Sequence, residues 1–238
     1  MNSLLKACWN LVFNSTGFDV SFDAKYRDWS FYLLELKANY QGVKELLAER
    51  NLVPKEIVPG ETRLQIVGCE MRAVQIAGPY NEVSIQVPVN PLENSPGEKY
   101  AHLFLPVSTE AARWPGVYIY GFPKFIAKID FAQHEGQITC HLATPGETIL
   151  EFSMEDKIGT KKQETWEYYG SRKHQIIRTI FDLEGLILEE ANPNVSFALG
   201  IHELADTIRR LLLSNEVVRT MIGHNVAGVL RKPVPVRL

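Results

Sequence analysis

The sequence predicts an α+β protein that is predominantly antiparallel β, folded as one large barrel-like sheet. Between about residues 63 and 154, seven short runs rich in β-branched and aromatic residues are separated by Gly, Pro and Asn clusters. Two other segments space their apolar residues as helices do. No linker, repeat or low-complexity tract interrupts the 238 residues, so we expect residues 1–238 to form a single domain.

The first expected element is a helix over residues 42–51, which places Val43, Leu46 and Leu47 on one face and ends before Pro54. A succession of strands follows it. The expected strands cover residues 64–77, 80–89, 102–107, 117–120, 125–132, 137–143 and 148–154.

Turn sequences at residues 134–136 and 145–147 predict hairpins between the last three strands. A second helix is expected over residues 201–213, where four apolar side chains form a stripe at helical spacing. A final strand is expected over residues 217–230, broken at Gly223.

The charge and hydropathy of the chain exclude two classes of partner. The formal net charge of −3 argues against a nucleic-acid-binding protein that uses a broad basic surface. No window approaches the roughly 20 apolar residues of a membrane span. The N-terminal apolar run is interrupted by Lys6 and Asn10 and no cleavage site follows it, so we expect a cytoplasmic protein without a signal peptide.

Standard cofactor and metal motifs are missing from the sequence. Cys8, Cys69 and Cys140 are far apart and include no CxxC pair, and the six histidines show no metal-ligand spacing. We therefore expect buried free thiols and no metal site. GxGxxG, GxxxxGK[ST] and GxSxG motifs are also absent, which removes support for dinucleotide, P-loop and serine-hydrolase sites.

The most informative segment is VYIYGFPKFIAKIDF, residues 117–131. Lys124 follows an aromatic–proline corner and begins a strand in which Phe125 and Lys124 face opposite sides. An apolar pocket disfavours the ammonium form of a lysine, and a neutral amine attacks ketones to form a Schiff base. The commoner alternative is a lysine whose amine stays in solvent while its stem packs on apolar groups.

These residues resemble the acetoacetate decarboxylase superfamily. Gly121-Phe122-Pro123-Lys124 is similar to the family's aromatic-Pro-Lys motif, whose lysine forms the Schiff base. Further similarities are the Val-Pro turn at residues 53–54, the strand at 62–66, the segment 79–89, and the C-terminal helix followed by a strand. Together they cover roughly residues 25–232 in order. The resemblance implies a barrel or cone-shaped sheet with a few flanking helices.

The resemblance assigns roles to individual residues. Lys124 corresponds to the Schiff-base lysine, and Glu82 to a family carboxylate that would move protons. Gln65 stands where the family has a glutamate, and Arg27 is the nearest candidate for its N-terminal arginine. Phe125 replaces the second lysine of the decarboxylases, so the Schiff-base step is better supported than the decarboxylation step.

The resemblance also implies the surroundings of the site. Tyr120, Phe122 and Phe125 would contact substrate beside Gln65 and Arg27. The implied substrate is a small keto acid, no cofactor is needed because the lysine itself withdraws electrons, and a homo-oligomer is expected.

Three functions remain open at this stage. The first is a lyase that decarboxylates a keto acid, or performs related aldol or dehydration chemistry, through Lys124. The second is a non-catalytic protein that binds small carboxylates on the same fold. The third is a structural or interaction role in which side chains fill the pocket.

Overall fold

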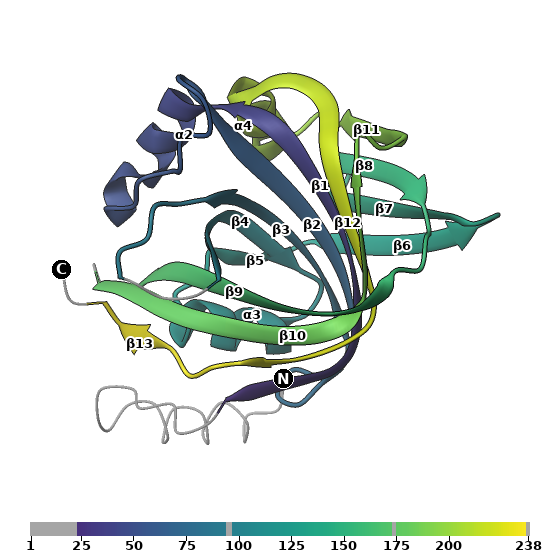
Figure 1. Cartoon of the computed structure of the whole chain (residues 1–238), viewed down its shortest axis with the longest axis horizontal. Helices are drawn as coiled ribbons and strands as arrows, with labels where there is room; N and C mark the ends of the chain where they lie inside the picture. The colour runs from purple at the N-terminus through teal and green to yellow at the C-terminus, as the bar shows by residue number, and fades with distance from the viewer. Residues whose placement is uncertain (1–22, 94–96, 173–174, 237–238) are drawn as a thin grey trace.

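The computed structural model describes residues 23–93, 97–172 and 175–236. Seven strands form a closed barrel, because β10 pairs with both β9 and β12 and thereby joins the two edges of one sheet (Figure 1). All neighbours are antiparallel except β4 and β9. In barrel order the strands are β12 (Leu212–Leu230), β1 (Ala24–Asn39), β2 (Glu61–Val74), β3 (Tyr80–Pro88), β4 (Glu98–Val107), β9 (Thr160–Arg172) and β10 (Gln175–Ala191).

A second sheet lies beside the barrel, on the right in Figure 1. It is antiparallel, in the order β11 (Val195–Leu199), β8 (Glu147–Glu155), β7 (Gln137–Thr144) and β6 (Lys128–His134). The rings of Phe131 and Phe152 lie about 3.0–3.1 Å from where a Cβ on Gly68 would be. Gly68 of β2 therefore allows the two sheets to approach closely.

Short elements complete the fold. Strand β5 (Lys124–Ile126) pairs in parallel with β4, and β13 (Val234–Pro235) pairs with β10. Helix α2 (Tyr40–Leu47) continues into a 3-10 turn, Ala48–Arg50, and lies near α4 (Glu203–Leu211) at one end of the barrel (Figure 1). Helix α3 (Glu110–Tyr118) joins β4 to β5.

Strand alternation produces two apolar cores. Along β1, Phe31 and Leu33 belong to a cluster inside the barrel, whereas Tyr32 and Leu34 belong to a cluster between the barrel, the second sheet and helices α2 and α4. The interior cluster is rich in aromatic residues and surrounds the candidate site.

The two predicted helices are confirmed: α2 begins two residues before its expected start and ends four residues before its expected end, and α4 is two residues shorter at each end. Asn39 caps α2 by accepting a hydrogen bond from the Gly42 N–H at 2.8 Å, and the His202 ring caps α4 through the Leu204 N–H at 3.0 Å. Both predicted hairpins also form. Glu135 and Gly136 have positive φ angles of 49° and 75°, as the primed turns of hairpins require.

Three predictions about strands are wrong. Residues 125–132 do not form one strand, because the chain passes at Ala127 from β5, beside the barrel, to β6 of the second sheet. Residues 117–120 are not a strand: Val117 ends α3 with Tyr118, although Pro115 and Gly116 inside the helix discourage that assignment. The final strand begins five residues earlier than expected and is not broken at Gly223, because β12 runs unbroken for 19 residues. Gly223 is required there by packing, since a Cβ would lie 2.1 Å from the ring of Phe31.

Two further expectations concern thiols and membranes. Cys69 and Cys140 are buried and free, as predicted, whereas Cys8 lies outside the described residues. In the described part of the chain, no helix has the length and apolar character needed to span a bilayer.

Candidate active site

Lys124 enters the barrel from a tight corner. Gly121 has a φ of +66°, which a residue with a side chain rarely adopts, and the Phe122 N–H then donates to the Gly116 carbonyl at 2.9 Å. Gly116 in α3 also leaves the space that the lysine stem occupies, because a Cβ there would lie 2.3 Å from Lys124 Cδ. The corner and the helix together direct the stem inward.

The amine of Lys124 meets the carboxylate of Glu82. Lys124 Nζ lies 2.6 Å from Glu82 Oε2, and the two side chains are only 7% and 12% exposed. The amine also lies 5.5 Å from the centroid of the Tyr80 ring, a distance at which a ring face attracts a cation. Glu82 and Tyr80 both belong to β3, of which Tyr80 is the first residue. Regular sheet structure therefore fixes both of these partners of the amine.

Two small, partly open cavities flank Lys124. The larger, about 50 Å³, lies inside the barrel and receives side chains from all seven barrel strands. The smaller, about 30 Å³, lies toward α3. Since one water needs about 10–15 Å³ by this kind of measure, the larger cavity accommodates a ligand of only a few non-hydrogen atoms. Lys124 is the sole cation among the described residues that line either cavity.

The cavity walls are neutral. Burial raises the pKa of the Tyr26, Tyr80 and Tyr168 phenols, and the nearby Glu82 carboxylate raises each of them further. Burial likewise raises the pKa of the Cys69 thiol, and Glu82 adds to this shift. These groups therefore remain protonated at neutral pH and leave the Lys124–Glu82 pair as the charged centre.

His102 was missed as a site residue by the sequence analysis. It lines the larger cavity from β4, stacked on Tyr168 with ring centroids 4.6 Å apart and edge-on to Phe122 at 4.8 Å. Burial, Lys124 and Arg50, in that order of influence, lower its pKa to about 3, so the imidazole is neutral. A polar residue on the inward face of a strand otherwise lined by apolar residues was its only signal.

A chain of hydrogen bonds runs from His102 along the barrel interior. His102 Nδ1 and Ser84 Oγ are 2.8 Å apart, and the Ser84 hydroxyl donates to Gln86 Oε1 at 2.8 Å. The Gln86 amide donates to Gln65 Oε1 at 3.0 Å, and the Gln65 amide donates to Glu35 Oε2 at 2.9 Å. We call this chain the polar relay.

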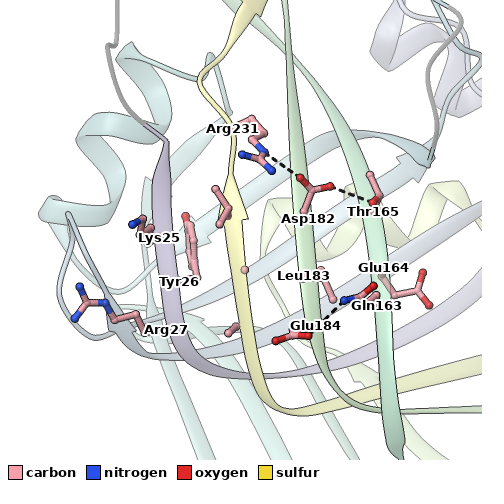
Figure 2. A pocket seen from close by; sticks show the side chains of 13 residues that line it. Lys25, Tyr26, Arg27, Gln163, Glu164, Thr165, Asp182, Leu183, Glu184 and Arg231 are labelled. Atoms are coloured by element: carbon pink, nitrogen blue, oxygen red, sulfur yellow. Dashed lines mark hydrogen bonds and ion pairs between the residues drawn. The ribbon is translucent and has the colours of Figure 1, made fainter.

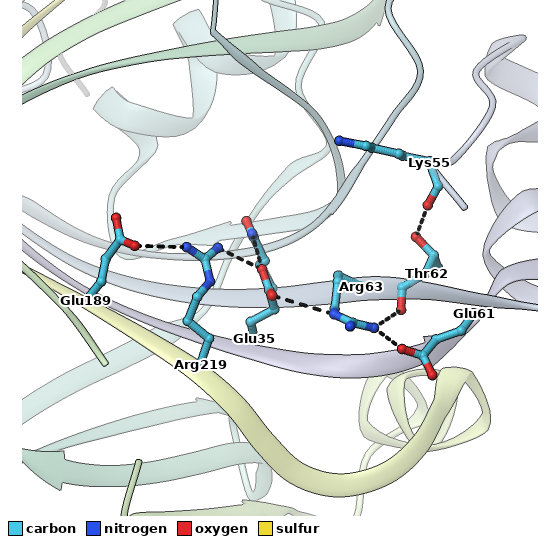
Figure 3. Close-up of polar contacts among 8 residues, drawn as sticks. Glu35, Lys55, Glu61, Thr62, Arg63, Glu189 and Arg219 are labelled. Atoms are coloured by element: carbon cyan, nitrogen blue, oxygen red, sulfur yellow. Dashed lines mark hydrogen bonds and ion pairs between the residues drawn. The ribbon is translucent and has the colours of Figure 1, made fainter. Parts of the chain in front are cut away.

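The polar relay ends in a cluster of charges. Glu35 also accepts from Arg219 at 2.8 Å and lies 3.6 Å from Arg63 Nε (Figure 3). Arg219 reaches Glu189 at 3.7 Å on its other side. Two arginines thus pair with Glu35 at the end of the relay.

The structure separates the residues that the sequence singled out. Phe122 lines both cavities, and Tyr120, which is buried, lines the smaller one. Gln65 is buried but reaches the larger cavity only through Gln86. Phe125 packs on the other side of its strand, where it lines a surface groove with residues of α4.

Arg27 is not part of the cavity wall. It is exposed and lines a separate open depression of about 620 Å³, together with Lys25 and residues of β9, β10 and β12 (Figure 2). Metal ligation has no candidate either, since the described residues contain no group of three His, Cys, Asp or Glu side chains able to hold an ion.

The sequence profile of the acetoacetate decarboxylase family matches residues 43–183, more than half of the chain, including Glu82, His102 and Lys124. The chain belongs to the acetoacetate decarboxylase family. Membership supports a lyase-type enzyme. None of the curated protein sequences is significantly similar to this family member.

Solved structures share its fold at low sequence identity. Acetoacetate decarboxylase from Legionella pneumophila superposes with a TM-score of 0.68 at 16% identity, over 96% of this chain and 94% of that one. The enduracididine biosynthesis enzyme MppR, in complex with the condensation product of pyruvate and imidazole 4-carboxaldehyde, gives 0.61 at 12%, over 93% and 92%. An acetoacetate decarboxylase-like enzyme from Sphingomonas wittichii gives 0.55 at 13%, over 90% and 92%.

Proposed function

We propose that this protein is a Schiff-base-forming lyase that acts on a small keto acid through Lys124. One observation carries the proposal: the amine lies 2.6 Å from Glu82 in a small, aromatic-lined cavity with no other cation among its described lining residues. A nucleophilic amine with a carboxylate in hydrogen-bond reach is the arrangement that imine formation needs. The pyruvate-bound state of the fold relative MppR supports the choice of a keto acid.

In the proposed reaction, Glu82 first accepts a proton from the Lys124 ammonium. The Nζ lone pair then forms a bond to the ketone carbon while the π electrons of the carbonyl move to its oxygen, and a proton passes from Nζ to that oxygen to give a carbinolamine. Glu82 returns its proton to the carbinolamine hydroxyl, which then leaves as water. Loss of water from this intermediate leaves a protonated imine. The Glu82 carboxylate stabilises the imine's positive charge, because it lies 2.6 Å from the lysine nitrogen and both side chains are little exposed to solvent.

The next step depends on the position of the carboxylate. In a 3-keto acid, the electrons of the C–C bond to the carboxylate flow to the imine nitrogen and carbon dioxide leaves. In a 2-keto acid, a proton leaves C3 and its electron pair flows to the nitrogen, with Glu82 as the nearest base. Both routes give an enamine, which is protonated, condensed with an aldehyde or dehydrated before hydrolysis frees Lys124.

Borohydride trapping tests the proposal. The protein is incubated with acetoacetate and then with a panel of 2-keto acids, each with borohydride, and Lys124 peptides are examined by mass spectrometry. We expect a reduced adduct on Lys124, absent in Lys124→Ala and retained in Lys128→Ala. The adduct mass shows whether carbon dioxide has left.

The competing function is a non-catalytic carboxylate-binding protein, in which a permanently charged Lys124 pairs with Glu82 and with its ligand. Calorimetric binding of the same acids without any trapped adduct would establish that function and overturn the lyase. Neither binding nor an adduct across the panel would leave a structural role.

A further inference from the structure

The polar relay has only one possible direction of hydrogen donation. Glu35 accepts from Arg219 and pairs with Arg63, so its oxygens serve as acceptors here and Gln65 turns its NH₂ group toward it. The Gln65 oxygen is then left to accept from Gln86. Both amide groups therefore have only one possible orientation, because a reversed amide would place oxygen against oxygen.

The same direction continues to His102. The Gln86 oxygen accepts a hydrogen bond from the Ser84 hydroxyl, and a hydroxyl group has only one proton to donate. Ser84 Oγ can therefore only accept from His102, so the proton of the neutral imidazole resides on Nδ1. His102 Nε2 consequently carries a lone pair and no proton.

Nε2 is the polar side-chain atom of His102 that has no partner in the polar relay. Within the described residues no group hydrogen-bonds to it, although the side chain is 4% exposed and lines the cavity that holds Lys124. Nε2 is not one of the buried polar atoms that lack a partner among the described residues, so it is open to the cavity, where water or a ligand can donate to it. A ligand that replaced this water without supplying a donor would leave the acceptor unpaired, which is unfavourable. A simple keto-acid anion has no such donor at neutral pH.

We propose that His102 is a substrate-contacting residue whose Nε2 accepts a hydrogen bond from the bound acid, and that the substrate is therefore a small keto acid bearing a hydroxyl group. This inference rests on the proposed function, because it places the hydroxyl in the cavity where Lys124 would bond to the ketone. It adds a specificity determinant to the cavity that holds the charged pair. Ser84 and Gln86, which also line the cavity, position this residue.

The tautomer is measured first, on the wild-type protein labelled with ¹⁵N-histidine. We expect His102 to show a protonated Nδ1 and an unprotonated Nε2 between pH 5 and 9, with its resonances assigned by their loss in His102→Asn. A proton on Nε2 would overturn the proposal.

Selectivity is measured with a matched pair of acids. In 3-hydroxypyruvate a hydroxyl occupies the place of the terminal methyl group of 2-oxobutyrate. For each protein we take the ratio of trapping efficiency with 3-hydroxypyruvate to that with 2-oxobutyrate. We expect this ratio to be about tenfold higher in the wild type than in His102→Asn. The asparagine amide can still donate to Ser84 but does not reach the Nε2 position. His102→Gln, which places an amide oxygen near that position, is expected to restore most of the ratio. An equal ratio in all three proteins would overturn the proposal.

A last readout distinguishes failure of this inference from failure of the proposed function. If neither acid forms an adduct, the lyase fails, but the ¹⁵N shift of His102 Nε2 still reports binding. A shift with 3-hydroxypyruvate and none with 2-oxobutyrate would support His102 as the contact in a binding protein. Identical responses to both acids would overturn it.

Discussion

Lys124 and Lys128 lie four residues apart, yet the fold gives them opposite environments. Lys124 is 7% exposed and paired with Glu82 at 2.6 Å, whereas Lys128 is 71% exposed and paired with Asp130 at 3.0 Å. Both lysines lie in the same strand-forming segment of the sequence, and each has one carboxylate partner. The difference comes from what covers them: α3 and the barrel interior enclose Lys124, whereas Lys128 begins β6 on the second sheet. Burial, more than ion pairing, therefore distinguishes a candidate nucleophile from a surface lysine.

The largest expected effect comes from removing each amine. Lys124→Met leaves the Glu82 carboxylate enclosed without its partner, so we expect the free energy of unfolding at pH 7 to fall by about 3 kcal/mol. Lys128→Met is expected to change it by less than about 0.5 kcal/mol. Urea denaturation measures both. The double variant Lys124→Met/Glu82→Gln should recover part of the loss, and equal losses in the two single variants would contradict this account.

A second change moves the Lys124 amine without removing it. In Gly116→Ala the new methyl group would lie 2.3 Å from Lys124 Cδ, and the flexible lysine stem must shift. We expect adduct formation with the best keto acid to slow at least about a hundredfold, since displacements of about 1 Å have such effects. Ala111→Gly, at an exposed position of the same helix, is the control for lost helix stability and should trap normally. Normal trapping by Gly116→Ala would show that α3 does not position the lysine.

Acid stability isolates the contribution of His102. Its pKa is about 3 in the folded protein and near 6.5 when unfolded, so the unfolded chain binds a proton that the folded protein refuses. The folded state therefore loses stability as the pH falls from about 6.5 to about 3, and His102→Gln should remove roughly 2 kcal/mol of that loss. Denaturation at pH 7 and pH 4 measures it. His134→Gln, at an 85% exposed side chain, is the control and should leave the pH dependence unchanged.

The smallest effect is expected at Arg27, which the sequence placed in the site and the structure places on an exposed surface. Arg27→Ala should alter trapping rates by no more than about twofold, the range of ordinary surface changes. A loss of tenfold or more would instead show that the depression in Figure 2 takes part in substrate binding.

The sequence predicted the parts of the fold that are encoded locally. Lys124 was found because its corner and its strand lie within one short segment, and α4 because its apolar stripe is complete within three turns. Helix α3 was missed because Pro115 and Gly116 are ordinarily read as helix breakers, although Thr109 caps the helix from the previous strand end. Strand β10 was not predicted, although it carried a signal, since every second residue from Ile177 to Ile187 is buried.

The polar relay could not have been predicted in this way. It needs Glu35, Gln65, Gln86 and His102 to lie side by side, and this depends on the registers of β1, β2, β3 and β4. A one-residue shift of any strand would turn its side chain to the other face of the sheet. The same limit applies to Arg27, whose approximate match to the family arginine does not fix which way it faces.

The closure of the barrel by β12 has a consequence for how the protein is made. This strand pairs with β1 near the start of the chain, as Ala24 opposite Leu230 shows, and its last residue also walls both cavities beside Lys124. While the chain is being synthesised, β1 and β10 must remain as open edges until β12 has left the ribosome. Exposed edges of this kind invite association with other chains, so synthesis is the period in which this barrel depends most on chaperones.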